Sequence, residues 1–115
     1  MKKAYHLGKC STCQRILSEL NWKGESQEIR SEKITEQQLD EMANLAGSYE
    51  ALFSRRAIKY KTMGLKNQNL KEADYKQLIL TDDTFLKRPV FIIDQEIFIG
   101  NSKKTVEALH ATLDV

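Results

Sequence analysis

The sequence has 115 residues, of which 41% are hydrophobic and 30% charged, with a formal net charge of +2 and two cysteines. This length fits one domain with a modest core, and the small net charge gives no reason to expect a nucleic-acid partner. No apolar run approaches the roughly 18 residues needed to cross a bilayer, and the charged start lacks the apolar segment of a secretory signal. We therefore expect a cytoplasmic protein without membrane association, whose cysteines are reduced.

The first third of the chain predicts a strand, a helix and a second strand. Residues 2–7 are expected to form a strand, and residues 11–22 a helix with four apolar side chains on one face: Cys13, Ile16, Leu17 and Leu20. Gly24 is expected to end the helical region. Residues 27–30 are expected to form the second strand.

The middle of the chain predicts several helices separated by short breaks. Thr35 and Gln38 have the spacing of a capping box, and the helix that they begin is expected to stop at Gly47. Shorter helical segments are expected at residues 48–53, 55–63 and 71–80.

The last part of the chain predicts a β-hairpin followed by a helix. The only proline, Pro89, precedes an apolar run at residues 90–93 that is typical of a buried strand. Residues 97–99 are expected to return as its hairpin partner, and Ser102 is expected to cap the last helix.

This order of elements predicts an α/β fold: a thioredoxin-like (glutaredoxin-like) domain with a mixed four-stranded sheet and a helical insertion before the β-hairpin. We expect a single domain over residues 1–115. Its thioredoxin-like halves are expected at about 1–34 and 87–115, and the insertion at about 35–86.

Cys10 and Cys13 form a Cys-x-x-Cys pair at the predicted junction of the first strand and helix. The first N–H groups of a helix have no intrahelical partners and carry partial positive charge. Such a position lowers the pKa of a thiol. The sequence therefore favours Cys10 as a reactive nucleophile and Cys13 as a resolving thiol, although Cys13 also fits as a core residue.

Two other uses of these cysteines are weaker. A structural zinc site needs four ligands, and only His6 and His110 are available to join the pair, so we expect no metal. A Cys-x5-Arg oxyanion loop is also disfavoured, because the residue six places after Cys10 is Ile16.

Several segments together resemble the ArsC/Spx family of arsenate reductase-like proteins. They are His6-x-x-x-Cys10, Cys10-x-x-Cys13, Tyr60-Lys61-Thr62-Met63-Gly64-Leu65, and Lys87-Arg88-Pro89-Val90 followed by Gly100. The cysteine pair is similar to Spx, whereas typical reductases of the family lack the second cysteine.

The resemblance implies roles for individual residues. The cysteine that matches Cys10 is the family's nucleophile, and Arg88 matches an arginine that holds the oxyanion beside a proline. Either Arg55 or Arg56 matches a second such arginine. Arg15 lies one place beyond another, which falls on Gln14, and Asn101 stands where a further one is expected. His6 is a candidate to favour the thiolate, and Pro89 is expected to have a cis peptide bond.

The resemblance implies a thiol-dependent reductase without a bound cofactor. Its substrate would be a small oxyanion such as arsenate, or a disulfide. The adduct would be resolved by Cys13 or by an external thiol, with glutathione, glutaredoxin or thioredoxin as the reductant. The alternative is a Spx-like redox-switched regulator that binds RNA polymerase by protein contacts, without direct contact with nucleic acid.

Overall fold

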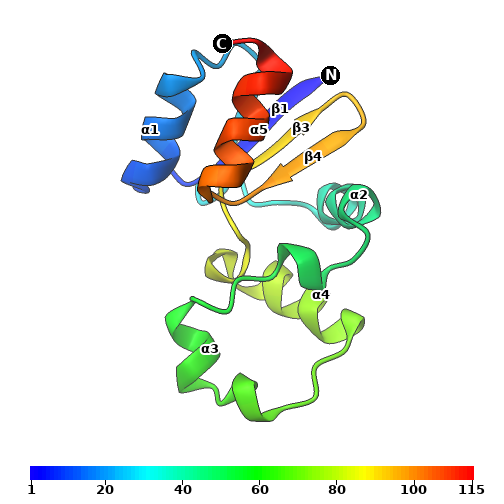
Figure 1. Cartoon of the computed structure of the whole chain (residues 1–115). Helices are drawn as coiled ribbons and strands as arrows, with labels where there is room; N and C mark the ends of the chain where they lie inside the picture. The colour runs from blue at the N-terminus through cyan, green and yellow to red at the C-terminus, as the bar shows by residue number, and fades with distance from the viewer. The chain divides into compact units, whose positions relative to one another are not determined.

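The computed structural model describes residues 1–115 (Figure 1). The chain divides into two compact units: a sheet unit of Met1–Lys33 with Arg88–Val115, and a helical unit of Ile34–Lys87. These boundaries lie one residue from those expected at 34 and 87. That the chain forms a single domain stays a prediction.

The sheet unit contains a mixed four-stranded sheet. Its strands are β1 (Lys2–His6), β2 (Glu25–Glu28), β3 (Val90–Ile93) and β4 (Glu96–Ile99), in the order β2-β1-β3-β4. Strand β1 runs parallel to β2 and antiparallel to β3, which forms the predicted hairpin with β4. The predicted α/β fold with a mixed four-stranded sheet is confirmed.

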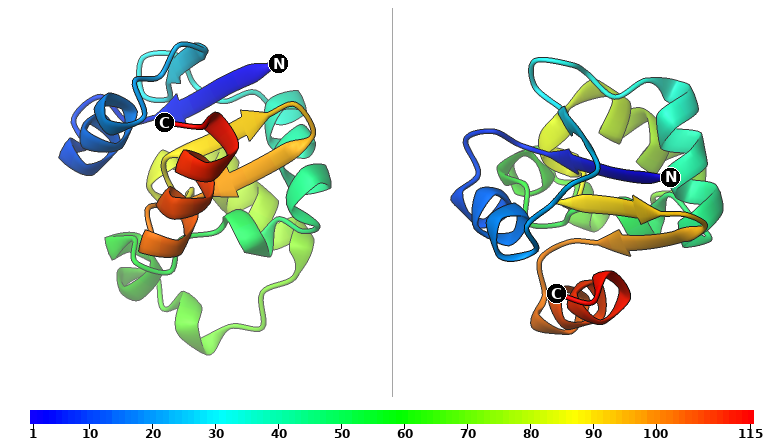
Figure 2. Two further views of the ribbon diagram at one scale, coloured as in Figure 1. Left: turned by 45° about the horizontal axis from the view of Figure 1, so that its top comes forward. Right: turned by 90° about the horizontal axis from the view of Figure 1, so that it is seen from above.

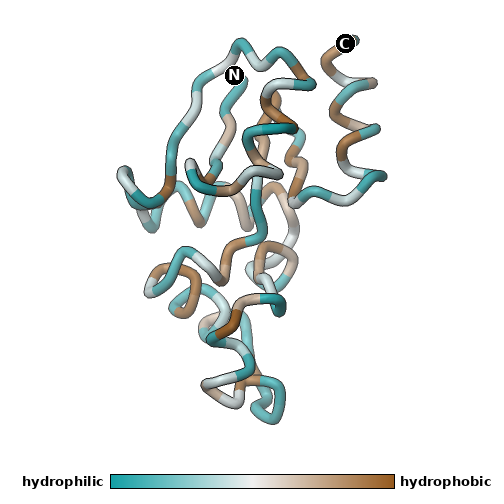
Figure 3. The backbone as a smooth tube through the Cα atoms, turned by 90° about the vertical axis from the view of Figure 1, so that its left-hand side faces the viewer, coloured by the Kyte–Doolittle hydropathy of each residue, from teal (hydrophilic) through white to brown (hydrophobic).

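Helices α1 (Ser11–Glu19) and α5 (Lys103–Leu113) cover one face of this sheet (Figure 2). The core between them joins side chains of both helices and three strands: Ala4, Ile16, Leu20, Phe91, Ile93, Phe98 and Leu109. Figure 3 shows the alternation of hydrophobic and hydrophilic residues along the helix that ends at the C-terminus, which is the pattern of a helix buried on one side.

The helical unit consists of three α-helices and three short 3₁₀ segments. They are α2 (Glu36–Ala46), η1 (Glu50–Leu52), α3 (Ile58–Thr62), η2 (Leu65–Asn67), α4 (Glu72–Thr81) and η3 (Asp83–Phe85). Phe53 lies at the centre of an aromatic cluster, with ring centroids 4.9 Å from Tyr75, 5.2 Å from Phe85 and 5.9 Å from Tyr60. No helix in either unit has both the length and the apolar character needed to cross a membrane.

Most of the predicted helix ends are confirmed. The Thr35 hydroxyl accepts from the Gln38 N–H at 3.1 Å, and the Gln38 side chain accepts from the Thr35 N–H, so the capping box is complete. Gly47 ends α2 with a φ of 96°, and the Ser102 hydroxyl accepts from the Thr105 N–H at the start of α5. Helix α3 is shorter than the predicted 55–63.

The predicted end of the first helix is wrong. Helix α1 stops at Glu19 rather than at residue 22, because Asn21 takes a left-handed conformation with a φ of 50°. The N–H of Trp22 then donates to the Leu17 carbonyl and that of Asn21 to the Ser18 carbonyl, which satisfies the last turn. The second strand accordingly begins at Glu25, two residues before the prediction.

Gly24 serves close packing instead of ending the helix. A Cβ atom added at Gly24 would lie 2.6 Å from the Lys2 carbonyl oxygen and 2.7 Å from a Trp22 ring carbon. The backbone at Gly24 therefore approaches strand β1 too closely for any side chain.

We predict that Gly24→Ala destabilises the protein, since the added methyl group forces the β1 backbone or the Trp22 ring to move. Overpacking of this kind costs about 1–3 kcal/mol. Thermal unfolding followed by circular dichroism measures the effect. Glu25→Ala, at the exposed neighbouring position, is the control and should leave the melting temperature almost unchanged. Equal melting temperatures for Gly24→Ala and the wild type would contradict the close approach.

Candidate functional site

Cys10 lies where the sequence predicts it, between β1 and α1. It is the N-cap residue of α1, and its Sγ accepts a hydrogen bond from the Cys13 N–H at 3.4 Å. Its own N–H donates to the Leu7 carbonyl at 3.0 Å, which closes a turn over residues 7–10. The Cys10 sulfur therefore takes the place that an oxygen occupies in an ordinary helix cap, and it is half-buried.

This position changes the acidity of Cys10. Partial burial raises the pKa of the Cys10 thiol, but the N–H and thiol of Cys13, the charge of Arg88 and the N–H of Thr12 all act in the opposite direction. The hydrogen bonds and the positive charge outweigh the burial, so the pKa of Cys10 lies below its ordinary value. A larger share of Cys10 is then thiolate at neutral pH, which is the reactive form.

Cys13 has the opposite environment. It lies in the first turn of α1, on the apolar face, and is completely buried. Burial raises the pKa of Cys13 to about 11, and a negative charge on Cys10 adds to that rise. Both cysteines are free thiols, and Cys10 is the more acidic and the less buried of the two.

His6 is close to α1 but does not act on the Cys10 thiol through a hydrogen bond. Its Nδ1 lies 3.1 Å from the Gln14 side-chain nitrogen, which also donates to the Leu7 carbonyl at 3.4 Å. This contact ties the end of β1 to the second turn of α1. His6 thus supports the structure around the cysteines.

Arg88 and Arg15 differ in their relation to the thiols. The positive charge of Arg88 lowers the pKa of both Cys10 and Cys13. The peptide bond between Arg88 and Pro89 is cis, as predicted. Arg15 is exposed and forms an ion pair with Glu19 at 2.8 Å, one turn further along α1. The structure brings Cys10, Cys13 and Arg88 into one interacting group.

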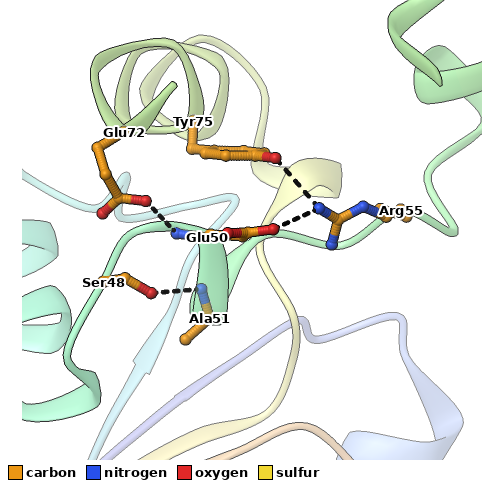
Figure 4. A network of polar contacts seen from close by, with 6 residues as sticks. All are labelled: Ser48, Glu50, Ala51, Arg55, Glu72 and Tyr75. Atoms are coloured by element: carbon orange, nitrogen blue, oxygen red, sulfur yellow. Dashed lines mark hydrogen bonds and ion pairs between the residues drawn. The ribbon is translucent and has the colours of Figure 1, made fainter. Parts of the chain in front are cut away.

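Arg55 and Arg56 belong to the helical unit. The Arg55 guanidinium donates to the Glu50 carboxylate at 2.8 Å and to the Tyr75 hydroxyl at 3.1 Å (Figure 4). The Glu50 N–H in turn donates to Glu72 at 3.2 Å. Arg56 is exposed. Arg55 is thus already engaged by a carboxylate of its own unit, whereas the Arg56 side chain faces solvent.

Glu28 is not among the residues that the sequence singles out. Its carboxylate accepts a hydrogen bond from the Gly8 N–H at 2.6 Å. Glu28 is paired in register with His6 at the carboxyl ends of the parallel strands β1 and β2. A signal was available, since parallel pairing of these strands brings their following loops together. The prediction of the second strand two residues too late hid that register.

The structure offers no metal site: no group of three or more His, Cys, Asp or Glu side chains is arranged to hold an ion. His110, the second histidine considered for zinc, has its Nδ1 3.0 Å from a backbone oxygen of Val115, two residues beyond the end of α5.

The ArsC family model matches residues 5–109, which is most of the chain. The chain belongs to the ArsC family. The predicted resemblance is therefore confirmed, and with it the thioredoxin-like fold of this family. No curated protein matches this ArsC family chain in sequence.

Solved structures similar to this ArsC family member extend over almost the whole chain. The YFFB protein has a TM-score of 0.82 at 19% identity and covers 98% of this chain and 99% of its own. An arsenate reductase from Vibrio cholerae has a TM-score of 0.79 at 16% identity, covering 94% and 96%. A protein from Staphylococcus aureus COL has a TM-score of 0.73 at 24% identity, covering 94% and 97%. At these identities the likeness shows the fold.

We predict two separate thiol titrations. As the pH rises, Cys10 should ionise below the ordinary pKa of a cysteine thiol, and Cys13 near 11. Thiolate absorbance in the ultraviolet measures both steps. Cys10→Ser should remove the first step and move the Cys13 step to lower pH, because the charge on Cys10 contributes to the raised pKa of Cys13. A first step at or above the free-cysteine value would contradict the electrostatics of the site.

We predict that Arg88→Gln raises the pKa of Cys10, because the substitution removes a positive charge that favours the thiolate. Alkylation of Cys10 by iodoacetamide at pH 7 should slow by about threefold or more, in proportion to the lost thiolate. Arg15→Gln removes the same charge from an exposed ion pair and should leave the rate unchanged. Equal slowing by both substitutions would mean that net charge alone controls the thiol.

Proposed function

We propose that this protein is a thiol-dependent oxidoreductase of the arsenate reductase type, with Cys10 as the nucleophile. The observation that supports the proposal best is the half-buried Cys10 sulfur at the N-cap of α1, with a lowered pKa and a second thiol three residues away. Membership of the ArsC family supports the same reaction class. The reaction needs no bound metal or organic cofactor.

With a disulfide substrate, the Cys10 thiolate attacks one sulfur and displaces the other as a thiolate, which takes up a proton. The product is a mixed disulfide at Cys10. Attack by the Cys13 thiolate on the Cys10 sulfur releases the second half of the substrate and leaves a Cys10–Cys13 disulfide. The substrate gains two electrons and the cysteine pair loses two, so a thioredoxin or glutaredoxin system must reduce the pair again.

With arsenate, the Cys10 thiolate displaces one oxygen, which leaves as water, and forms a sulfur–arsenic(V) bond. A second thiol then attacks the Cys10 sulfur and breaks that bond, so that arsenic leaves as arsenic(III) and a disulfide is formed. The second thiol is Cys13 or an external thiol such as glutathione. The charge of Arg88 acts at Cys10 and stabilises the negative charge of the substrate.

Cys13 is suited to react second. Burial is the main reason for its raised pKa, but the negative charge on Cys10 contributes as well. Formation of a covalent bond at Cys10 removes that charge. The pKa of Cys13 then falls by the part that this charge contributes, which favours the resolving thiolate after the substrate has been captured.

Two features favour a disulfide over arsenate. Gln14 and Asn101 stand where the resemblance implies oxyanion-binding arginines, and Arg55 already pairs with Glu50. Attack on a disulfide needs only the thiolate and a second thiol.

External thiol reductants and free cysteines fit a reducing compartment such as the cytoplasm.

A redox-switched regulator of the Spx type is the second candidate, because Cys10 and Cys13 are both present. The matching family and the similar solved structures give no support for RNA polymerase as a partner. A pull-down with the polymerase α subunit, under oxidising and reducing conditions, tests this candidate. It predicts binding in one redox state, and the absence of binding in both states eliminates it.

We predict that the wild type catalyses the oxidation of NADPH in assays coupled to glutathione with glutaredoxin or to thioredoxin, with a small mixed disulfide or arsenate as the substrate. Cys10→Ser should reduce the rate to background, because the nucleophile is lost. Cys13→Ser should form a mixed disulfide at Cys10 that persists in the mass spectrum.

One result would decide against this function, and a second would identify the resolving thiol. If Cys10→Ser and the wild type give equal rates, Cys10 is not the nucleophile. If Cys13→Ser turns over as fast as the wild type, an external thiol rather than Cys13 resolves the adduct. Arg15→Ala, on the exposed face of α1, serves as a control for general disturbance of that helix.

A further inference from the structure

The Glu28 carboxylate accepts hydrogen bonds from four donors in two separate loops. Its Oε2 accepts from the Gly8 N–H at 2.6 Å. Its Oε1 accepts from the Ser31 N–H at 2.7 Å, the Ser31 hydroxyl at 2.9 Å and the Arg30 N–H at 3.1 Å. Each oxygen thus serves one loop, so the side chain links the loop before α1 to the loop after β2.

The loop that receives Oε2 is the turn that carries the proposed nucleophile. The Cys10 N–H donates to the Leu7 carbonyl, which makes Gly8 the second residue of this four-residue turn. The Gly8 N–H points out of the turn toward β2 and is held there by Glu28. Fixing Gly8 therefore fixes the turn that ends at Cys10.

Gly8 lies so close to the Glu28 side chain that little space is left for a side chain of its own. A Cβ atom at Gly8 would lie 3.2 Å from the Glu28 Cγ, which is tighter than an ordinary van der Waals contact, and 3.4 Å from its Oε2. A side chain at position 8 would therefore push the carboxylate away from the backbone that it holds.

We propose that Glu28 is a positioning residue for the Cys10 thiolate: by holding the Gly8 N–H, its carboxylate sets the turn that aims the Cys10 sulfur at the first N–H groups of α1. Glu28 acts through the turn and not on the sulfur directly. The inference rests on the proposed role of Cys10 as the nucleophile.

The acidity of Glu28 agrees with this role. Hydrogen bonds from Gly8 and then Ser31 lower the pKa of Glu28 to about 2, against a small effect of desolvation. A lowered pKa in the folded state stabilises the fold above the unfolded value of about 4.3, and this contribution disappears as the pH falls toward 2. The carboxylate is therefore charged, and the contact complete, at every pH at which Cys10 could react.

Replacing Glu28 with glutamine distinguishes a positioning role from an effect of its negative charge alone on the pKa of Cys10. Glutamine keeps one acceptor oxygen but replaces the other with an NH₂ group, so the variant can accept hydrogen bonds from only one of the two loops. Loss of a negative charge alone would lower the pKa of Cys10 or leave it unchanged, since a nearby carboxylate disfavours a thiolate. Loss of the turn geometry raises it, so the two explanations differ in sign.

The test measures the iodoacetamide alkylation rate of Cys10 against pH in three proteins that all carry Cys13→Ser, so that only Cys10 reacts. The first has the wild-type sequence otherwise, the second adds Glu28→Gln and the third adds Glu25→Gln. We expect Glu28→Gln to raise the Cys10 pKa and slow alkylation at pH 7 about threefold to tenfold. Glu25→Gln removes the same charge from an exposed position on the same strand and should match the wild type. An unchanged or lowered Cys10 pKa in Glu28→Gln would overturn the proposal.

Two further measurements keep the result interpretable. Hydrogen exchange of the Gly8 amide should be faster in Glu28→Gln and unchanged in Glu25→Gln. If Glu28→Gln does not fold, or if exchange at Gly8 stays slow because the amide oxygen still accepts from its N–H, Gly8→Ala tests the same contact with all charges retained and should raise the Cys10 pKa. An unchanged pKa in Gly8→Ala would then overturn the proposal.

Alkylation needs neither arsenate nor a disulfide. A raised Cys10 pKa in Glu28→Gln together with an inactive wild type would leave the positioning role intact and remove the proposed activity. Full activity of the wild type together with an unchanged Cys10 pKa in Glu28→Gln would overturn the positioning role and leave the proposed activity intact.

Discussion

The hydrogen bond from the Cys13 N–H to the Cys10 sulfur depends on where α1 begins. Three things fix that start. Strand β1 ends at His6, the turn over residues 7–10 reverses the chain, and Ile16 and Leu20 bury one face of the helix in the core of the sheet unit. A helix that began one residue later would leave the sulfur in an ordinary loop. The chemistry of the site is thus a consequence of helix register.

The same register makes the two thiols unequal. A residue three places after the N-cap lies in the first turn, and the apolar face of α1 takes it into the core, so Cys13 is buried while Cys10 is not. Burial raises the pKa of Cys13, and the helix start lowers that of Cys10. A Cys-x-x-Cys spacing at a helix start therefore makes the first thiol more acidic than the second.

Features that depend on neighbouring residues could be predicted from the sequence, and features that depend on distant contacts could not. The Thr35–Gln38 capping box, the hairpin after Pro89 and the placement of both cysteines are local, and each is confirmed. The predicted end of α1 lies too late in the sequence. Asn21 ends this helix by taking a left-handed conformation, and an asparagine in that conformation leaves no strong signature in a sequence. The Gly8–Glu28 contact spans 20 residues and follows from parallel strand pairing. The pairing of Arg55 with Glu50 follows from the fold of the helical unit.

The contacts of Arg55 and of Arg88 bear on which substrates this protein can bind. Arg55 is exposed and shares its guanidinium with Glu50 and Tyr75, so an oxyanion would have to compete with a carboxylate already in place. An exposed pair of this kind is weak, at about 0–1 kcal/mol, and a multiply charged anion could displace it. Arg88 acts on the thiols themselves, and its charge serves any substrate on which negative charge develops beside Cys10. Arg88 is therefore the arginine of the sheet unit whose charge acts at the proposed nucleophile, whereas Arg55 is paired within the helical unit.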